Sequence, residues 1–541
     1  MSRVRVWPAV LETLLAPILL YSAFEMRTRL SLVFIAAVGG ISAATCDSLS
    51  TLKLAQTTIT SAKTVTAGEK IERPGSGQLP PTPPYCRVQG VIAPSADSHI
   101  QFEVWLPESG WNGKYQGIGN GGFAGAISYA PLALAVKAGY AASSTDSGHE
   151  AGGTDGRWAY GHYEKIVDYG YRAIHETADK AKEVIRAFYG EAPKHSYFAS
   201  CSNGGRQALM EAQRFPADYD GIIAGAPAIP VTRLNTAFLW NMQALAQPGA
   251  YIPTSKLRAI EDAALAACDA SDGVKDGVID SPAACKFDPA VLLCKGPEND
   301  SCLTEAQLGA LTKIYGGLRN AKGEAMYPGF SPGGEAEPGG WGAWITGTGV
   351  GKSTQGAFGS QFHSQFLMDE SDKDFLDFHP DHELKIADDK LGRALNAADP
   401  NLKAFHARGG KLIMYHGWAD AAIPPVSTVN YYESVTKFMG KKTTGEFVRL
   451  YMVPGMEHCR GGAGTDDFGA TAGMAGDAGS NLSLALENWV ENKTAPAQII
   501  ASKQKSGTTV RTRPLCPYPQ VAKYSGSGST DEAGNFSCAG K

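Results

Sequence analysis

Residues 197–212 have the sequence YFASCSNGGRQALMEA, and this stretch decides the fold. Its first three residues predict a short buried strand, and the run from Asn203 predicts a helix with two glycines in its first turn. Ser202 then lies on a strand-to-helix turn with a glycine two positions later, a turn that exposes a nucleophilic serine. The general motif begins with glycine where this chain has Ser200, which is also small. The alternative interpretation is an ordinary helix cap.

A partner for Ser202 is indicated by a second, distant pair of residues. A serine becomes a nucleophile at neutral pH when a histidine lies within hydrogen-bond reach. Cys201 directly precedes Ser202, and Cys459 directly follows His458. If the two cysteines form a disulfide, their Cα atoms lie about 5–6 Å apart, which brings serine and histidine together. We therefore favour a catalytic pair over a purely structural disulfide.

An acidic third member follows from the predicted strands. Residues 411–417 (KLIMYHG) have the pattern of a buried parallel strand, and Asp420 lies on the loop that follows. Residues 447–453 predict another buried strand, which leads into His458. The order Ser202, Asp420, His458 is that of the α/β-hydrolases. The alternative for Asp420 is a helix-capping or turn aspartate.

A glycine-rich loop supplies candidate oxyanion donors. Residues 115–118 predict a strand, and 119–123 (GNGGF) follow it. We expect the main-chain N–H groups of Gly121, Gly122 and Asn203 to form the oxyanion hole. The loop lacks the Gly-Lys-Ser/Thr ending of a phosphate-binding loop.

The chain divides into a core in two parts with an insertion between them. Strands and helices alternate in 45–230 and again in 410–541, which predicts a parallel sheet flanked by helices. Residues 231–409 lose this pattern and are rich in Gly, Pro and aromatic residues. We expect them to form a large lid domain inserted at the C-terminal edge of the sheet. The predicted fold class is an α/β-hydrolase core with a large inserted lid.

Composition limits the partners. The formal net charge is −5 and charged residues make up 19% of the chain, so no basic surface argues for nucleic acid. Ten cysteines favour an oxidising compartment. We expect a secreted or periplasmic protein without stable membrane association. The sequence does not predict its oligomeric state.

The N-terminal residues 1–44 predict a targeting segment. Two arginines, at 27 and 29, precede the apolar run 30–38, and small residues follow as far as Ala44. Met26 is an alternative translation start. Charged residues and a proline interrupt the earlier apolar stretch, which argues against a membrane anchor.

On these motifs, the chain resembles the tannase and feruloyl esterase family, whose hallmark is the same CS–D–HC arrangement. The family also contains the mono(2-hydroxyethyl) terephthalate hydrolases. The likeness spans nearly all of the mature chain. The matching stretches are GNGGFAG (119–125), SCSNGGRQALMEAQRFPADYDGIIAGAPA (200–228), CDASDGVKDGVID (268–280), HGWAD (416–420) and PGMEHC (454–459). The resemblance implies an α/β-hydrolase core, a large lid, a structural calcium site and hydrolysis of esters of aromatic carboxylic acids.

The calcium site would lie in the acidic loop 269–280. Hard cations take carboxylate and carbonyl oxygens, and the glycines of the loop permit sharp turns. The spacing differs from that of an EF-hand, and a solvated acidic turn is the alternative. Family matching implies Ca²⁺ ligands at Asp269, Asp272 and Asp276 through side chains, and at Val274 and Val278 through carbonyls.

Sequence alone leaves the disulfide connectivity open. The family pattern implies a bond between Cys201 and Cys459 and bonds between sequential neighbours among the other cysteines. These are Cys46–Cys86, Cys268–Cys285, Cys294–Cys302 and Cys516–Cys538.

The expected function is a secreted serine carboxylesterase that acts on aromatic esters through an acyl-enzyme. Feruloyl esters, including those attached to plant polysaccharide, are the leading substrates; galloyl esters (tannase activity) and terephthalate monoesters are alternatives. A peptidase, or a catalytically silent secreted binding protein, would be a different class.

Lid composition bears on this choice. No arginine occurs between Arg319 and Arg393, so the lid arginine that clamps the terephthalate carboxylate in the resembling hydrolases is missing. Lys352 could substitute only as a point charge. Five lid aromatics could line an acyl pocket: Trp240, Trp341, Trp344, Phe358 and Phe362.

Overall fold

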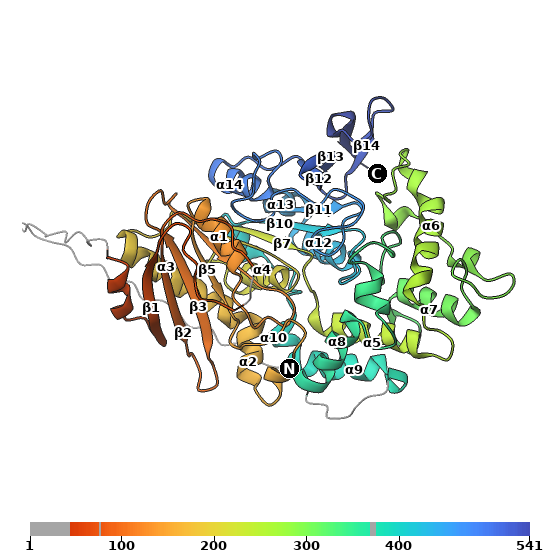
Figure 1. Ribbon diagram of the computed structural model, residues 1–541, viewed down its shortest axis with the longest axis horizontal. Helices are drawn as coiled ribbons and strands as arrows, with labels where there is room; N and C mark the ends of the chain where they lie inside the picture. The colour runs from red at the N-terminus through yellow and green to blue at the C-terminus, as the bar shows by residue number, and fades with distance from the viewer. Residues whose placement is uncertain (1–43, 75–76, 368–374, 541) are drawn as a thin grey trace, which may run out of the picture. The chain divides into compact units, whose positions relative to one another are not determined.

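Nine strands of the described part of the chain form one twisted sheet, in the order β1-β2-β3-β5-β4-β6-β7-β10-β11 (Figure 1). They are β1 (Thr57–Val65), β2 (Tyr85–Ile92), β3 (Ile100–Pro107), β4 (Lys114–Ile118), β5 (Ala141–Thr145), β6 (His195–Cys201), β7 (Gly221–Gly225), β10 (Lys411–Gly417) and β11 (Val448–Val453). Strands β5, β4, β6, β7, β10 and β11 pair in parallel, while β1, β2 and β3 extend the sheet with antiparallel pairs that end on β5. The predicted parallel sheet is confirmed, and the antiparallel extension was not predicted.

The computed structural model describes residues 44–541 apart from 75–76, 368–374 and 541. These described residues belong to one compact unit. The predicted targeting segment, 1–44, lies outside the described residues except for Ala44. Within the described ranges, no helix combines the length and the apolar content that crossing a membrane requires.

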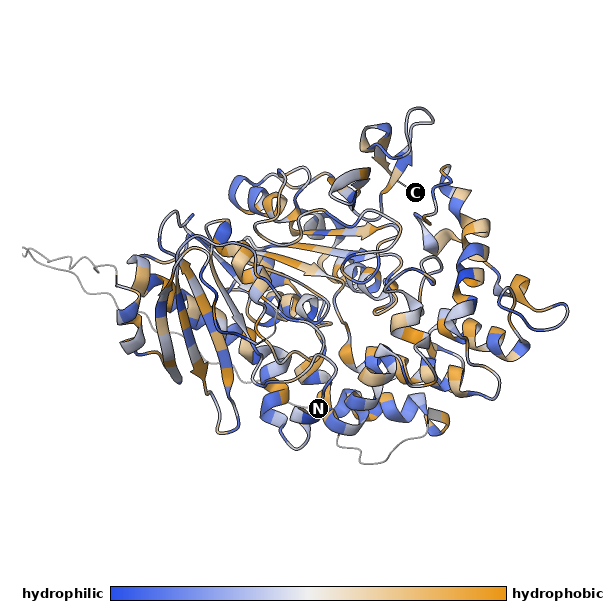
Figure 2. Ribbon diagram, viewed as in Figure 1, coloured by the Kyte–Doolittle hydropathy of each residue, from blue (hydrophilic) through white to orange (hydrophobic). Residues whose placement is uncertain are grey.

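Helices cover both faces of the sheet because its strands are apolar on both faces. Successive residues Leu412 and Ile413 of β10 belong to two separate buried clusters. One cluster contains α1 (Tyr129–Lys137) and α14 (Leu482–Asn492), and the other contains α3 (Ala173–Tyr189), α4 (Asn203–Arg214) and α12 (Val426–Met439). Figure 2 shows the apolar central strands between these helices. Short helices α2 (Tyr163–Val167) and α13 (Lys441–Phe447) complete the core.

The residues for which we predicted a lid, 231–409, lie between β7 and β10. Most members of two apolar clusters come from this insertion, and helices α5 to α8 lie beyond the C-terminal ends of the parallel strands (green in Figure 1). Its elements are α5 (Val231–Ala246), α6 (Leu257–Cys268), α7 (Glu305–Gly316), β8 (Leu318–Arg319), β9 (Ala325–Tyr327), α8 (Thr354–Gln361), α9 (Pro380–Ala387), α10 (Arg393–Leu395) and α11 (Lys403–Ala407). In the sequence the insertion begins after β7 and ends before β10. In space it belongs to the same compact unit as the core.

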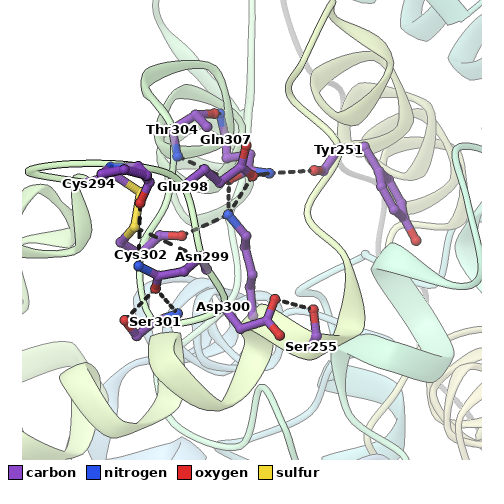
Figure 3. Close-up of polar contacts among 12 residues, drawn as sticks. Tyr251, Ser255, Cys294, Glu298, Asn299, Asp300, Ser301, Cys302, Thr304 and Gln307 are labelled. Carbon is purple, nitrogen blue, oxygen red and sulfur yellow. Dashed lines mark hydrogen bonds and ion pairs between the residues drawn. A yellow bond between two sulfur atoms is a disulfide. The ribbon is translucent and has the colours of Figure 1, made fainter.

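All five predicted disulfides are present in the described residues. The Cys294–Cys302 bond closes a small lid loop (Figure 3). The ammonium of buried Lys256 holds this loop by donating to Glu298 Oε1 at 2.7 Å and to the Cys302 carbonyl at 2.8 Å. A buried ammonium is tolerated only when such partners satisfy it.

Two hairpins end the chain. They are β12 (Ile499–Lys505) with β13 (Thr508–Leu515), and β14 (Val521–Tyr524) with β15 (Phe536–Ala539). The disulfide Cys516–Cys538 joins the two hairpins.

Candidate active site

The three predicted catalytic residues meet at the C-terminal ends of their strands. Ser202 follows β6, Asp420 follows β10 and His458 follows β11. His458 Nε2 lies 2.9 Å from Ser202 Oγ, and its Nδ1 lies 2.8 Å from Asp420 Oδ2. This geometry fits an imidazole that accepts the serine proton at Nε2 and donates from Nδ1 to the carboxylate. The Cys201–Cys459 disulfide, with Cα atoms 6.0 Å apart, holds the two loops together.

The turn at Ser202 has the strained backbone of a nucleophile elbow. Ser202 adopts φ 67° and ψ −126°, a left-handed conformation that only surrounding structure can hold in a residue with a side chain. A Cβ on Gly204 would lie 1.8 Å from Ser200 Oγ, and one on Gly205 would lie 2.2 Å from the Gly225 carbonyl. Ser200 stands where the general motif has glycine, so its side chain occupies space that is otherwise open. Gly204 leaves room for this side chain because it has no Cβ.

Two histidines, rather than one, hold Asp420. The carboxylate Oδ2 also accepts from His416 Nε2 at 3.0 Å, while Oδ1 accepts the N–H groups of Ala422 and Ile423. Burial raises the pKa of Asp420, but the adjacent His458 and the hydrogen bonds from both histidines outweigh it and hold the pKa below its ordinary value. His416 is fully buried and orients the acid. The sequence does not indicate this contact between His416 and Asp420, which depends on how the loop after β10 folds.

The oxyanion loop is held close to Ser202 by residues that sequence analysis did not identify. His149 Nε2 contacts the Phe123 carbonyl at 2.8 Å, and Tyr169 donates to the Gly122 carbonyl at 3.2 Å. Gly122 has φ 59°, and a Cβ there would lie 2.3 Å from the Gly153 carbonyl. These contacts fix where its amide points.

Two of the three predicted oxyanion donors face the same cavity as the triad. Gly122 and Asn203 line it together with Ser202 and His458, whereas Gly121 does not. Asn203 begins α4, where the first N–H groups have no partner inside the helix. No described carbonyl accepts from the main-chain N–H of Gly122 or Asn203, so both remain free for a substrate oxygen.

The cavity beside Ser202, called here the aromatic pocket, is mainly apolar. Its lining residues are Gly122, Phe123, Tyr169, Ser202, Asn203, Ala228, Val231, Leu234, Asn235, Phe238, Trp344, Phe358, Ala422, Ile423 and His458. The Trp344 ring lies edge-on to the His458 ring with centroids 5.2 Å apart, and it is nearly parallel to Phe358. Of the five lid aromatics that we named as candidates for an acyl pocket, these two line it and the other three do not. Among the described residues, no basic side chain other than His458 lines the pocket, and Lys352 does not reach it.

The acidic loop has the donor chemistry of a calcium site, although its side chains are not gathered around one point. Asp269 accepts the N–H groups of Asp276 and Gly277 and so closes the loop. Burial and the neighbouring carboxylates of Asp276 and Asp269 raise the pKa of Asp272. A bound cation would relieve the repulsion among these carboxylates. Asp276 lies 2.6 Å from Arg513, which occupies part of its coordination sphere.

In the described residues, the set of three possible metal ligands that does converge within 4.8 Å lies elsewhere: His175, Glu211 and Asp218. His175 Nδ1 lies 2.6 Å from Asp218 Oδ2, and the ammonium of Lys182 donates to the Asp218 carbonyl. Burial and the Asp218 charge raise the pKa of Glu211 well above its ordinary value. The two basic side chains therefore accompany Asp218, while the raised pKa of Glu211 favours its neutral form and so removes the need for an ion.

The fold and this site define the class: an α/β-hydrolase with a large inserted lid that hydrolyses carboxylic esters. The family model described as tannase and feruloyl esterase matches residues 86–539, so this chain belongs to the tannase and feruloyl esterase family. An uncharacterised esterase of Xanthomonas campestris pv. campestris is 41% identical, covering 94% of both chains. Mono(2-hydroxyethyl) terephthalate hydrolase of Piscinibacter sakaiensis is 31% identical over 86% of both. The crystal structure of feruloyl esterase B from Aspergillus oryzae matches with a TM-score of 0.85 at 28% identity, covering 91% of this chain and 99% of that one.

Proposed function

We propose that this protein is a serine esterase that hydrolyses esters of phenolic acids, with feruloyl esters as its best substrates. The observation that carries the proposal is the hydrogen-bonded chain from Ser202 through His458 to Asp420 at the aromatic pocket. An apolar, ring-lined cavity suits a flat aromatic acyl group. A catalytically silent binding protein would not need this chain of hydrogen bonds.

The reaction would proceed in two halves. Ser202 Oγ attacks the ester carbonyl while His458 Nε2 takes its proton, and Asp420 stabilises the imidazolium. The N–H groups of Asn203 and Gly122 receive the charge that develops on the carbonyl oxygen. His458 then protonates the leaving alcohol, and water, activated by the same histidine, hydrolyses the acyl-enzyme.

The pocket favours a phenolic acid over terephthalate. A terephthalate monoester would carry its free carboxylate into a cavity whose described lining has no arginine or lysine, and a buried carboxylate without such a partner is unfavourable. Relatives named feruloyl esterase B support the phenolic choice. Galloyl esters remain the competing substrate.

Calcium and export complete the proposal. Asp269, Asp272 and Asp276, with the carbonyls of Val274 and Val278, would bind a structural Ca²⁺, since these are hard oxygen donors. Binding requires Asp276 to share its carboxylate with Arg513.

Five disulfides support an oxidising, extracellular or periplasmic location.

The test is Ser202→Ala assayed on a panel of methyl ferulate, methyl gallate and mono(2-hydroxyethyl) terephthalate. Loss of a triad nucleophile costs about 10⁶ in kcat, so the variant should lose measurable activity while it keeps its melting temperature. Wild-type kcat/KM should be highest on methyl ferulate. Normal turnover by the variant would refute the assignment of Ser202, and a tenfold preference for gallate would make the enzyme a tannase.

A further inference from the structure

One helix of the lid supplies a whole wall of the aromatic pocket. Val231, Leu234, Asn235 and Phe238 of α5 all line it, and the spacing i, i+3, i+4, i+7 places them on one helical face. Three of these side chains are apolar. Asn235 is the exception, although it is as buried as its neighbours, with 3% of its surface exposed.

The Asn235 amide is only half satisfied. Its Nδ2 donates to the Val231 carbonyl at 3.0 Å, whereas its Oδ1 has no hydrogen-bond partner. The amide of Asn203, the other asparagine of the pocket, is paired, because its Oδ1 accepts from Arg206 Nε at 2.8 Å. Among the described residues that line the pocket, Asn235 alone carries a buried side-chain atom without a partner.

Such an orphan acceptor needs a physical reason. About 90% or more of buried polar groups in proteins are hydrogen-bonded, and leaving one unpaired is costly. Apolar residues occupy the other pocket positions of α5, so a leucine would avoid that cost. The asparagine is explained if a bound ligand supplies the missing donor.

We propose that Asn235 Oδ1 accepts a hydrogen bond from a ring hydroxyl of the substrate's acyl group and thereby selects phenolic acids with one free hydroxyl. This inference rests on the proposed esterase function. The terminal torsion of asparagine is broad, so the amide can turn its oxygen toward the ligand. A phenol provides a donor and an ionised carboxylate does not. Gallate brings three hydroxyls to one orphan acceptor, which leaves two of them without a comparable partner.

Two esters that differ by a single oxygen test the proposal. Wild-type enzyme should hydrolyse methyl p-coumarate with a kcat/KM at least about tenfold above that on methyl cinnamate, because only the former has the ring hydroxyl. Asn235→Leu removes the acceptor and should bring this ratio close to about 1. Asn235→Asp keeps an acceptor and should preserve the preference for the hydroxylated ester.

Asn241→Leu is the matched control. Asn241 lies on the same helix, is equally buried, and bonds Gln355 outside the pocket. This change should leave the ratio between the two esters unaltered, even if it lowers both activities through stability. An unchanged ratio in an Asn235→Leu enzyme that still hydrolyses cinnamate would overturn the role of Asn235 while leaving the esterase function intact. Wild-type enzyme inactive on both esters would overturn the proposed function itself.

Discussion

At the scale of single residues, a second carboxyl group lies next to the triad without belonging to it. Glu457 precedes His458, is 2% exposed, and its Oε1 has no hydrogen-bond partner. Burial, together with the carboxylates of Glu337, Asp420 and Glu261, raises the pKa of Glu457 to about 8. At neutral pH this side chain is therefore protonated, and it adds no negative charge beside the imidazole.

This raised pKa predicts a pH-dependent effect of Glu457→Gln on stability. Between the ordinary pKa of 4.5 and about 8, the folded protein keeps a proton that the unfolded chain has lost. The free energy of unfolding therefore falls as pH rises through that window. Glutamine mimics the protonated form, so the variant should gain melting temperature relative to wild type at pH 8 and show little gain at pH 5. Exposed Glu305→Gln is the control, and an equal effect at both pH values would contradict the prediction.

Individual residues were predictable where the signal is local. Ser202 and His458 could be found because each adjoins a cysteine, and Asp420 because it follows a strand of clear pattern. Asn235 could not be found in this way, since its significance depends on which face of α5 borders the pocket. The contact of Tyr169 with Gly122 likewise joins segments that are far apart in the sequence, whereas His416 contacts Asp420 from only four residues away.

At the scale of elements, the position of α4 depends on how closely it approaches β7. A methyl group on Gly205 would meet the Gly225 carbonyl at 2.2 Å and the Pro227 Cα at 3.0 Å. Both obstacles are backbone atoms, which cannot rotate away as a side chain would. The helix that begins after Ser202 would therefore have to move, and the elbow with it.

Gly205→Ala should consequently destabilise the protein by about 1–3 kcal/mol or more and lower activity as well. Gly309→Ala is the matched control, because Gly309 lies inside α7 and has open space around its missing Cβ. That change should stabilise slightly, by up to about 1 kcal/mol, through helix propensity. Thermal denaturation of the two variants compares them directly. Equal melting temperatures would show that α4 tolerates the displacement.

Elements of the core were predictable to within a residue or two because their apolar runs and flanking glycines are continuous. The strand predicted at 411–417 has these bounds in the structure, and the one predicted at 447–453 begins one residue later, at Val448. The lid has short helices and long loops held by disulfides, so its periodicity is weak. For the same reason, three of the five lid aromatics proposed for the pocket pack elsewhere.

At the scale of the whole molecule, the acidic loop lies against the C-terminal hairpins. Asp276 contacts Arg511 and Arg513 of β13, far along the chain from the loop. A Ca²⁺ ion bound there would tie the lid to the C-terminal segment through these contacts. Metal binding to the folded state alone stabilises it by mass action.

Chelation should therefore lower the melting temperature, and added Ca²⁺ should restore it, with kcat unchanged below the transition. Asp272→Asn should abolish the response to Ca²⁺, since it removes one carboxylate ligand. Glu305→Gln again serves as the control, being exposed and outside the acidic loop. A melting temperature that is indifferent to Ca²⁺ in metal-free protein would exclude the site.

The Cys201–Cys459 bond connects the two halves of the core across the entire lid. It joins residues 258 positions apart, and chain entropy suggests a stabilisation of up to about 5 kcal/mol. Because the bonded cysteines adjoin Ser202 and His458, the bond also fixes the distance over which the proton is transferred. Replacing both cysteines by alanine should lower kcat by about 10²-fold and leave KM nearly unchanged, since misplacement of about 1 Å between reacting groups has that effect. The same replacement at Cys516 and Cys538, which joins two terminal hairpins, should reduce stability without changing kcat. If the Cys201 and Cys459 double variant folds and retains full kcat, the loops around the active site position the two residues without the disulfide.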